Sequence, residues 1–210
     1  MLKQKDHQTI YFSMSVSLLS AIQAHAPAFS EAALELGSPL IERKTCRPKE
    51  LILEAGKVCE HLYLAESSII RCFYHDQEGE EQTLWMKPEQ TFLTEYKSFV
   101  HGQPSGFSLQ VYEATELICI SRAALLELYA QSQEWALFGL HLTEHLHITL
   151  IDVFVNLLAN DATQNYRYIE YAFPSFLQVA PLKDIASMLQ VSPVTLSRIR
   201  SGTQSKKQVS

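Results

Sequence analysis

Glycine is scarce in this chain, which has only 7 among its 210 residues. The loops that cradle nucleotide phosphates need several closely spaced glycines, and neither the P-loop spacing nor the dinucleotide-binding spacing occurs. The order of serine, histidine and aspartate also fits no hydrolase triad. We therefore expect that the protein is not an enzyme.

Cysteine is similarly sparse, and its spacing matters more than its number. The four cysteines form no CxxC pair and no metal-ligand cluster; they are Cys46, Cys59, Cys72 and Cys119. Each lies in a strand-like context without a near neighbour in sequence. We expect reduced thiols in a cytoplasmic protein and no cofactor. A redox or iron-sulfur role is the alternative that these residues leave open.

Long apolar runs are also absent, since none reaches the length that spans a bilayer, and we expect no membrane partner. Lys3 and Lys5 precede a mildly apolar segment that ends in Ala24-His25-Ala26 and superficially resembles a signal peptide. Polar residues interrupt that segment at Gln8, Ser13, Ser15, Ser17, Ser20 and Gln23. We interpret it as part of an amphipathic helix and not as an export signal.

Positive charge is lacking overall, because the formal net charge is −6. The charge is unevenly distributed. After residue 162 six basic residues stand against two acidic ones, a net +4, so the preceding 162 residues carry −10. A basic terminal segment on an acidic body is expected when only that segment meets phosphate.

The hydrophobic pattern changes period along the chain. Residues 15–37 show helical spacing with a break at Pro27. From Pro39 to Ser121 the period is two, and turn residues separate short segments rich in branched and aromatic side chains. These segments are LIERKTC, ELILEAG, LYLAESSIIRCFY, EQTLWMK, FLTEYKSF and SLQVYEATELICIS. Many short strands without intervening helices predict a sandwich or a jelly-roll barrel.

Two helices are expected after the barrel. The first covers 123–131, and the second runs from Ser132 to about Asn160, which would make it roughly 40 Å long. The second is apolar on more than one face and needs cover on two sides, for which a second copy of the chain is the natural candidate. His145, Thr149 and Asp152 break the heptad pattern, so a regular coiled coil is not assured. His141 and His145 have the i, i+4 spacing of metal ligands, although such pairs more often lie in interfaces.

The stretch LKDIASMLQVSPVTLSRIR, Leu182 to Arg200, predicts two short helices joined by a tight turn. In the first helix Leu182, Ile185, Ala186 and Leu189 share one face. Ser192 is the expected N-cap of the second helix, with Pro193 at its first position. Gly202 is placed for a left-handed cap after Arg200. The pattern predicts a helix-turn-helix, whose second helix enters the DNA major groove.

This order of barrel, long helix and helix-turn-helix resembles the Crp/Fnr family of bacterial transcription regulators. Three stretches carry the resemblance: LILEAGKVCEHLYLAESSIIRCFY, FLTEYKSFVHGQPSGFSLQVYEATEL and PLKDIASMLQVSPVTLSRIR. It implies an α+β protein with a cyclic-nucleotide-binding-domain-like jelly-roll barrel at 1–131, a dimerisation helix at 132–161 and an all-α helix-turn-helix DNA-binding domain at 162–210. It further implies a homodimer, joined through helix 132–160, that binds double-stranded DNA at a pseudo-palindromic site.

The second stretch resembles the phosphate-binding cassette of the family and departs from it. Glu95 matches the family's glutamate, but Thr94 replaces the glycine before it. Ser105 occupies the position of the arginine that grips the cyclic phosphate, followed by Gly106 and Phe107. Without a guanidinium, a buried phosphate loses a bidentate charged pair. We expect no binding of cyclic AMP in the family manner; the effector, if there is one, is open.

The third stretch resembles the family's DNA reader. Arg198 matches its central arginine and is the best candidate for guanine recognition, while Val194 replaces a glutamate and can pack on a thymine methyl group. The other expected DNA contacts are Ser192, Pro193, Thr195, Ser197 and Arg200, with Lys206 and Lys207 on the phosphate backbone.

Two alternatives remain open from the residues. A cupin-like enzyme would be another jelly roll, but it needs clustered metal ligands, and His61, His75 and His101 are isolated. A barrel that binds a protein partner, with a vestigial reader, would keep the fold without the DNA.

Overall fold

The computed structural model describes residues 18–202. Its first element is helical at 18–23, and α2 follows at Glu31–Gly37, with Ser30 as its N-cap. The break expected at Pro27 is therefore confirmed. The interpretation of residues 1–17 and the DNA contacts expected of Lys206 and Lys207 lie outside the described residues.

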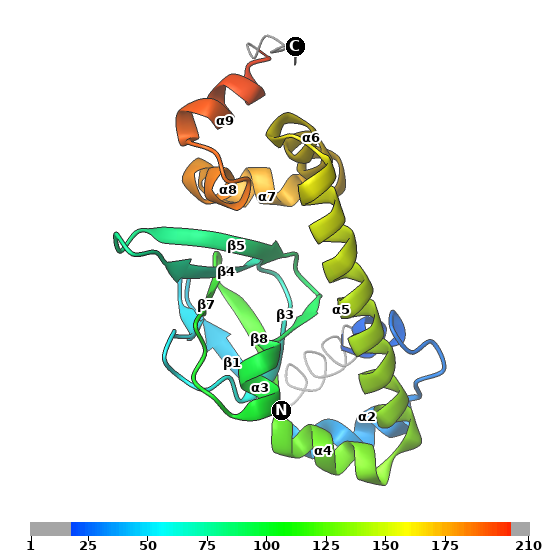
Figure 1. Cartoon of the computed structure of the whole chain (residues 1–210). Coiled ribbons are helices and arrows are strands. Elements are labelled where there is room, and N and C mark those ends of the chain that lie inside the picture. Colours follow the sequence, from blue (N-terminus) through cyan, green and yellow to red (C-terminus); the bar gives the residue numbers. More distant parts are fainter. Residues whose placement is uncertain (1–17, 203–210) are drawn as a thin grey trace, which may run out of the picture.

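Within residues 18–202, eight strands form two four-stranded antiparallel sheets, which face each other as a barrel (Figure 1). A short 3-10 helix, η1 (Ser38–Leu40), leads into them. One sheet has the order β1-β8-β3-β6 and the other β2-β7-β4-β5, the two-sheet arrangement of a jelly roll. The strands are β1 (Ile41–Cys46), β2 (Leu51–Leu53), β3 (His61–Ala65), β4 (Ile70–His75), β5 (Glu81–Lys87), β6 (Phe92–Leu93), β7 (Ser108–Val111) and β8 (Thr115–Ser121). The predicted jelly roll is confirmed.

The segment predicted as a strand at 92–99 is mostly helix instead. Only β6 is extended, and α3 follows at Tyr96–His101. Glu95 caps this helix by accepting hydrogen bonds from the N–H groups of Lys97 and Ser98, and Gly102 ends it with a φ of 65°. Capping at both ends outweighs the strand propensity of the aromatic residues.

The two helices after the barrel are α4 (Arg122–Gln131) and α5 (Gln133–Ala159), whose N-cap is Ser132. The first part of α5 packs into the main core. Trp135 is fully buried, and its indole N–H donates to the carbonyl oxygen of Ala33 at 2.8 Å. Phe138 and Leu142 follow it into the same core. The start of α5 is thus fixed between the barrel and α2.

The second part of α5 is exposed on several sides. Its exposed large apolar residues include Ile148, Leu150, Ile151, Val153, Phe154, Val155, Leu157 and Leu158. By length and composition α5 is apolar enough to cross a membrane, with a mean hydropathy of 1.3, so the expectation that no segment reaches this threshold was wrong. The same threshold is passed by helices that pack against protein. Residues 18–202 therefore leave this part of α5 largely uncovered.

Four helices follow: α6 (Ala162–Ala172), α7 (Pro174–Val179), α8 (Leu182–Met188) and α9 (Pro193–Arg200). Asp161 and Gln164 form a capping box at the start of α6. Figure 1 shows α8 lying over β5, with α9 beyond it. Three barrel residues, Ile69, Met86 and Tyr112, belong to the same hydrophobic cluster as the buried residues of α6 to α9. The helical domain is therefore packed on the barrel.

Candidate functional site

The predicted helix-turn-helix is present as α8 and α9. The turn between them is tight, with the N–H of Val191 donating to the carbonyl of Ala186 at 3.0 Å. Gln190 has a φ of 56°, in the left-handed region that a sharp reversal requires. Ile185 and Ala186 meet Leu196 and Ile199 in one buried cluster.

Helix α9 presents a polar and basic face to solvent. Ser192 caps it, accepting from the N–H of Thr195 at 3.1 Å, and Pro193 stands at its first position. Gly202 follows the helix with a φ of 70°, as predicted. The exposed residues are Ser192, Pro193, Val194, Ser197, Arg198 and Arg200, with Thr195 half-buried. The residues expected to contact DNA therefore share one accessible region.

The polar side chains expected to surround an effector, those of Glu95 and Ser105, make hydrogen bonds within the chain. Both carboxylate oxygens of Glu95 accept from backbone N–H groups of α3, at 3.2 and 3.0 Å. The hydroxyl of Ser105 donates to the carbonyl of Phe107 and accepts from the N–H of the same residue, both at 2.9 Å. Gly106 is exposed, while Phe107 is half-buried against the main core and meets the ring of Tyr74 edge-on. Glu95 and Ser105 are therefore both engaged in hydrogen bonds within the cassette.

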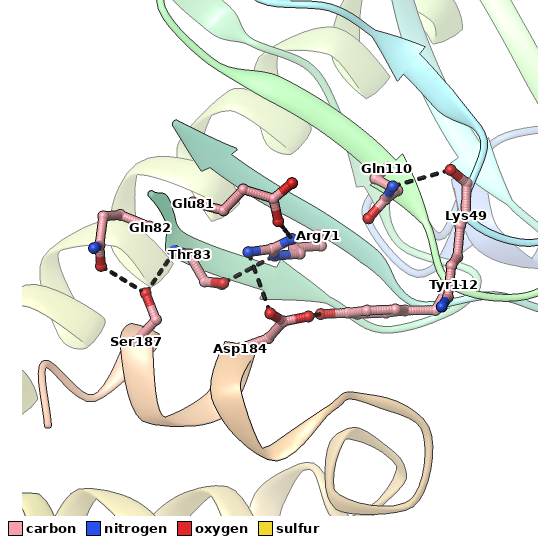
Figure 2. A network of polar contacts seen from close by, with 9 residues as sticks. All are labelled: Lys49, Arg71, Glu81, Gln82, Thr83, Gln110, Tyr112, Asp184 and Ser187. Atoms are coloured by element: carbon pink, nitrogen blue, oxygen red, sulfur yellow. Dashed lines mark hydrogen bonds and ion pairs between the residues drawn. The ribbon is translucent and has the colours of Figure 1, made fainter. Parts of the chain in front are cut away.

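A buried polar network, which the sequence did not predict, joins the barrel to α8 (Figure 2). Arg71 on β4 is 2% exposed. Its Nε donates to Thr83 Oγ1 at 2.9 Å, its Nη1 pairs with Glu81 at 2.6 Å, and its guanidinium lies over the ring of Phe73. Its Nη2 lies 3.3 Å from Asp184 Oδ1. We call these contacts the Arg71 network.

The carboxylate of Asp184 connects this network to a second strand of the same sheet. Tyr112, which follows β7, donates its hydroxyl to Asp184 Oδ2 at 2.8 Å. Burial, followed by the charge of Asp184, raises the pKa of Tyr112, so this hydroxyl keeps its proton. One carboxylate oxygen of Asp184 therefore faces the guanidinium of Arg71, and the other accepts a hydrogen bond from Tyr112.

Ser187, one turn further along α8, makes a second polar contact with the barrel. Its hydroxyl donates to Gln82 Oε1 at 2.9 Å and accepts from the N–H of Thr83 at 2.8 Å. Figure 2 shows both contacts beside the Arg71 network. The first helix of the helix-turn-helix is thus held to β4 and β5 at two successive turns.

The sequence held one clue to this network. Arg71 interrupts the apolar run Ile69-Ile70 to Cys72-Phe73, and a charge inside a buried strand requires partners. The identity of Asp184, 113 positions later, had no local signal. A charge on the first reader helix is ordinarily a solvated residue, as Lys183 is here.

The histidines of α5 do not form a metal centre with the residues around them. In residues 18–202 no group of three or more histidines, cysteines or carboxylates lies close enough to hold a metal ion. The ring of His145 instead meets that of His25, with centroids 4.9 Å apart.

Comparison with known proteins identifies the barrel. Residues 43–132 match the family model described as the cyclic nucleotide-binding domain. No curated protein matches the chain in sequence.

Several solved structures are similar over most of the chain. The Catabolite Activator Protein of Thermus thermophilus has a TM-score of 0.52 at 21% identity, covering 83% of this chain and 84% of that one. FixK2 of Bradyrhizobium japonicum has a TM-score of 0.62 at 15% identity, with 80% and 89% covered. A protein of Eubacterium rectale, assigned to the Crp/Fnr family of transcriptional regulators, has a TM-score of 0.63 at 15% identity, with 82% of each chain covered.

The class of protein follows from the barrel, the long helix and the helical domain together. The barrel strands from β2 to β8 lie within the residues 43–132 that match the cyclic nucleotide-binding domain. Its described residues have the fold of the Crp/Fnr transcription regulators, which confirms the resemblance inferred from sequence.

Proposed function

We propose that this protein is a dimeric transcription regulator that binds double-stranded DNA in a sequence-specific manner through α9. The observation that carries the proposal is the exposed face of α9, where serine hydroxyls and two arginines surround a helix anchored by Leu196 and Ile199. A helix held on one side and polar on the other fits the DNA major groove. The net positive charge after residue 162 favours the same partner.

Within this face Arg198 reads a guanine and Val194 contacts a thymine methyl group. Val194 is 61% exposed, so its methyl groups are accessible to DNA. Ser192, Ser197 and Arg200 position the helix on phosphates.

In vitro selection from random DNA tests this assignment. An enriched pseudo-palindrome is expected, with half-sites about one helical turn, roughly 34 to 36 Å, apart. Arg198→Ala then lowers affinity for the selected site by about 1 to 3 kcal/mol, while Arg47→Ala, which removes an exposed arginine from the barrel, leaves it unchanged. Selection that enriches no sequence would contradict the proposal and favour a barrel that binds a protein partner.

The dimer is proposed from a stripe along α5. Leu137, Leu140, Ile151, Phe154 and Leu158 are exposed and follow the three-and-four spacing of a coiled-coil seam, which we call the α5 stripe. Glu144 and His147 occupy the intermediate positions of the seam, whereas His145, Thr149 and Asp152 project from other sides of the helix. A second copy placing the same stripe against it would cover all five apolar residues.

Sedimentation velocity tests the dimer. The wild-type chain is expected to sediment as a dimer, and Phe154→Glu as a monomer, because it places a charge in the seam. Asp152→Lys changes a charge on the same helix outside the stripe and is expected to leave the dimer intact. A monomeric wild-type chain at micromolar concentration would contradict this part of the proposal.

We further propose that the barrel does not bind cyclic AMP in the family manner. The Ser105 hydroxyl is engaged by the backbone of Phe107, and Glu95 caps α3. Neither side chain supplies the positive charge that pairs with a cyclic phosphate. Calorimetric titration with cyclic AMP is expected to show no saturable heat. Binding at micromolar affinity would refute the proposal.

A further inference from the structure

A primary amine stands in an apolar cleft between the barrel, α5 and the helical domain. The cleft has a volume of about 660 Å³. Strand β5, the cassette, helix α5 and the helical domain all contribute to its lining, which includes Trp85, Met86, Thr94, Leu150, Val153 and Phe176. We call this space the interdomain cleft. The amine is that of Lys87, the last residue of β5.

Lys87 is half-buried, so its side chain is open to a molecule in the cleft. The end of β5 that carries it points towards α5 (Figure 1). No aspartate or glutamate lines the cleft, and among residues 18–202 none forms an ion pair with Lys87. An ammonium group at this position is partly desolvated and has no counter-charge, which favours the uncharged amine.

Lys44 on β1 is the opposite case within the same chain. Its Nζ lies 2.7 Å from Glu50 Oε1, and its side chain is 51% exposed. The hydrogen bond to Glu50 raises the pKa of Lys44, whereas burial lowers the pKa of Lys87. Only an uncharged amine has the lone pair that attacks a carbonyl carbon, so Lys87 is the better nucleophile of the two.

The titratable side chains around Lys87, in the part of the chain that the structure describes, do not favour its charge. Those that line the cleft with it are Tyr96, His145, His147 and Tyr168. The ring of His25 lies 4.9 Å from that of His145. Burial, followed by the charges of His145 and Lys87, lowers the pKa of His25, so its imidazole is uncharged at neutral pH.

We propose that Lys87 is a modification site that forms an imine with aldehydes whose apolar body fits the interdomain cleft. The amine nitrogen attacks the carbonyl carbon to form a C–N bond, and one proton moves from nitrogen to oxygen to give a carbinolamine. The hydroxyl group then leaves with the remaining N–H proton as water. Lysine and aldehyde thus give the imine and one water molecule, and no oxidant or reductant takes part.

The lining of the cleft selects the aldehyde. An aromatic or aliphatic body is removed from water by contact with Trp85, Leu150 and Phe176, whereas a small hydrophilic aldehyde gains little from the same walls. The reaction needs only the amine and the cleft. The proposal therefore stands apart from DNA binding and from the proposed function.

Reductive trapping tests the proposal on the full-length chain at neutral pH. The probes are 1-naphthaldehyde, which has an apolar body, and glyoxylate, which is small and hydrophilic. Cyanoborohydride reduces each imine to a stable secondary amine, and peptide mass spectrometry measures the labelling of each lysine. With naphthaldehyde, Lys87 is expected to be labelled at least about tenfold faster than Lys44 or Lys97, an exposed lysine of α3. Glyoxylate is expected to label Lys87 no faster than these two.

Three variants locate the reaction. Lys87→Arg keeps the positive charge but removes the nucleophile, so the fast labelling is lost while that of Lys44 is unchanged. Val153→Trp fills the cleft and is expected to slow the labelling of Lys87 at least about tenfold. Ile148→Trp adds the same side chain to an exposed position of α5 that does not line the cleft, and it should leave the labelling of Lys87 unchanged. Circular dichroism confirms that each variant is folded.

Urea separates the effect of the fold from that of the local sequence. Once the chain is unfolded, Lys87, Lys44 and Lys97 are expected to react at similar rates with naphthaldehyde. Three results would overturn the proposal. They are equal labelling of the three lysines in the native chain, unchanged labelling of Lys87 in Val153→Trp, and a faster reaction of Lys87 that persists in urea.

Discussion

Replacing Asp184 by alanine is expected to release the reader from the barrel. Asp184 is 3% exposed and is the residue through which α8 meets both Arg71 and Tyr112. Arginine cannot lose its proton in a protein, so the variant leaves a permanent buried charge with fewer partners.

The magnitude follows from the contacts that remain. Breaking a buried ion pair by removing one partner costs about 3 to 5 kcal/mol. Arg71 keeps Glu81 and Thr83, and within the described residues its Nη2 makes no hydrogen bond to begin with, so the lower end applies. The Tyr112 hydroxyl loses its acceptor, which adds about 1 kcal/mol. We expect a total loss of about 3 to 4 kcal/mol.

Urea denaturation followed by circular dichroism measures the loss in the transition that unfolds α6 to α9, and small-angle scattering measures whether the helical domain leaves the barrel. Lys183→Ala removes the neighbouring exposed charge and is the control, expected within about 0.5 kcal/mol of wild type. The double variant Arg71→Met, Asp184→Leu replaces the pair by apolar groups and should recover most of the stability.

Two outcomes would refute this reasoning. One is an Asp184→Ala variant as stable as Lys183→Ala, which would mean that the buried pair contributes nothing. The other is a double variant as unstable as the sum of its single variants, which would show that the two residues act independently.

Three further predictions concern the barrel and its surroundings. Gly37→Ala places a Cβ 2.5 Å from the ring of the buried Trp135 and should lower the free energy of unfolding by about 1 to 3 kcal/mol, measured in thermal melts. In the control Gly106→Ala the new Cβ meets nothing within 4 Å, so no change is expected. Equal melting temperatures of the two variants would contradict this prediction. Burial raises the pKa of Cys72 to about 12, so its thiol should resist Ellman's reagent at pH 8 until urea is added, and fast labelling of the native chain would be the contrary result. The hydrogen bond from Arg71 lowers the pKa of Glu81 below 4.5, so the stability that this bond contributes is present above pH 4.5 and is lost as the pH falls through the lower folded pKa. Glu81→Gln should therefore flatten the acid limb of the plot of unfolding free energy against pH. An unaltered acid limb would refute this role of Glu81.

The barrel and the reader could be predicted from sequence because their signals are local. Alternation of apolar residues over five or six positions predicts a strand whatever lies elsewhere in the chain. In the same way, Ser192 followed by Pro193 predicts the start of a helix. The segment at 92–99 was misread because aromatic residues favour strands, while the cap at Glu95 depends on hydrogen bonds that periodicity does not register.

The contact between the two domains could not be predicted, because it pairs residues far apart in sequence. Arg71 and Asp184 have no motif that links them, and Lys87 gives no indication of its surroundings. The expected effector residues illustrate the same limit. Glu95 and Ser105 were assigned by position in a family pattern, and only their hydrogen-bond partners show that both are engaged within the chain.

Helix α8 also bears on how a protein of this fold diverges during evolution. Nearly every position of this seven-residue helix is engaged: Ile185 and Ala186 hold α9, Asp184 and Ser187 hold the barrel, and Met188 packs against the hydrophobic cluster of the helical domain. On α9, by contrast, Val194 and Ser197 are exposed and lie outside the buried cluster. Under the proposed function, heritable change at these exposed positions of α9 can alter the DNA that is bound while α8 stays fixed, without rebuilding the junction between the domains.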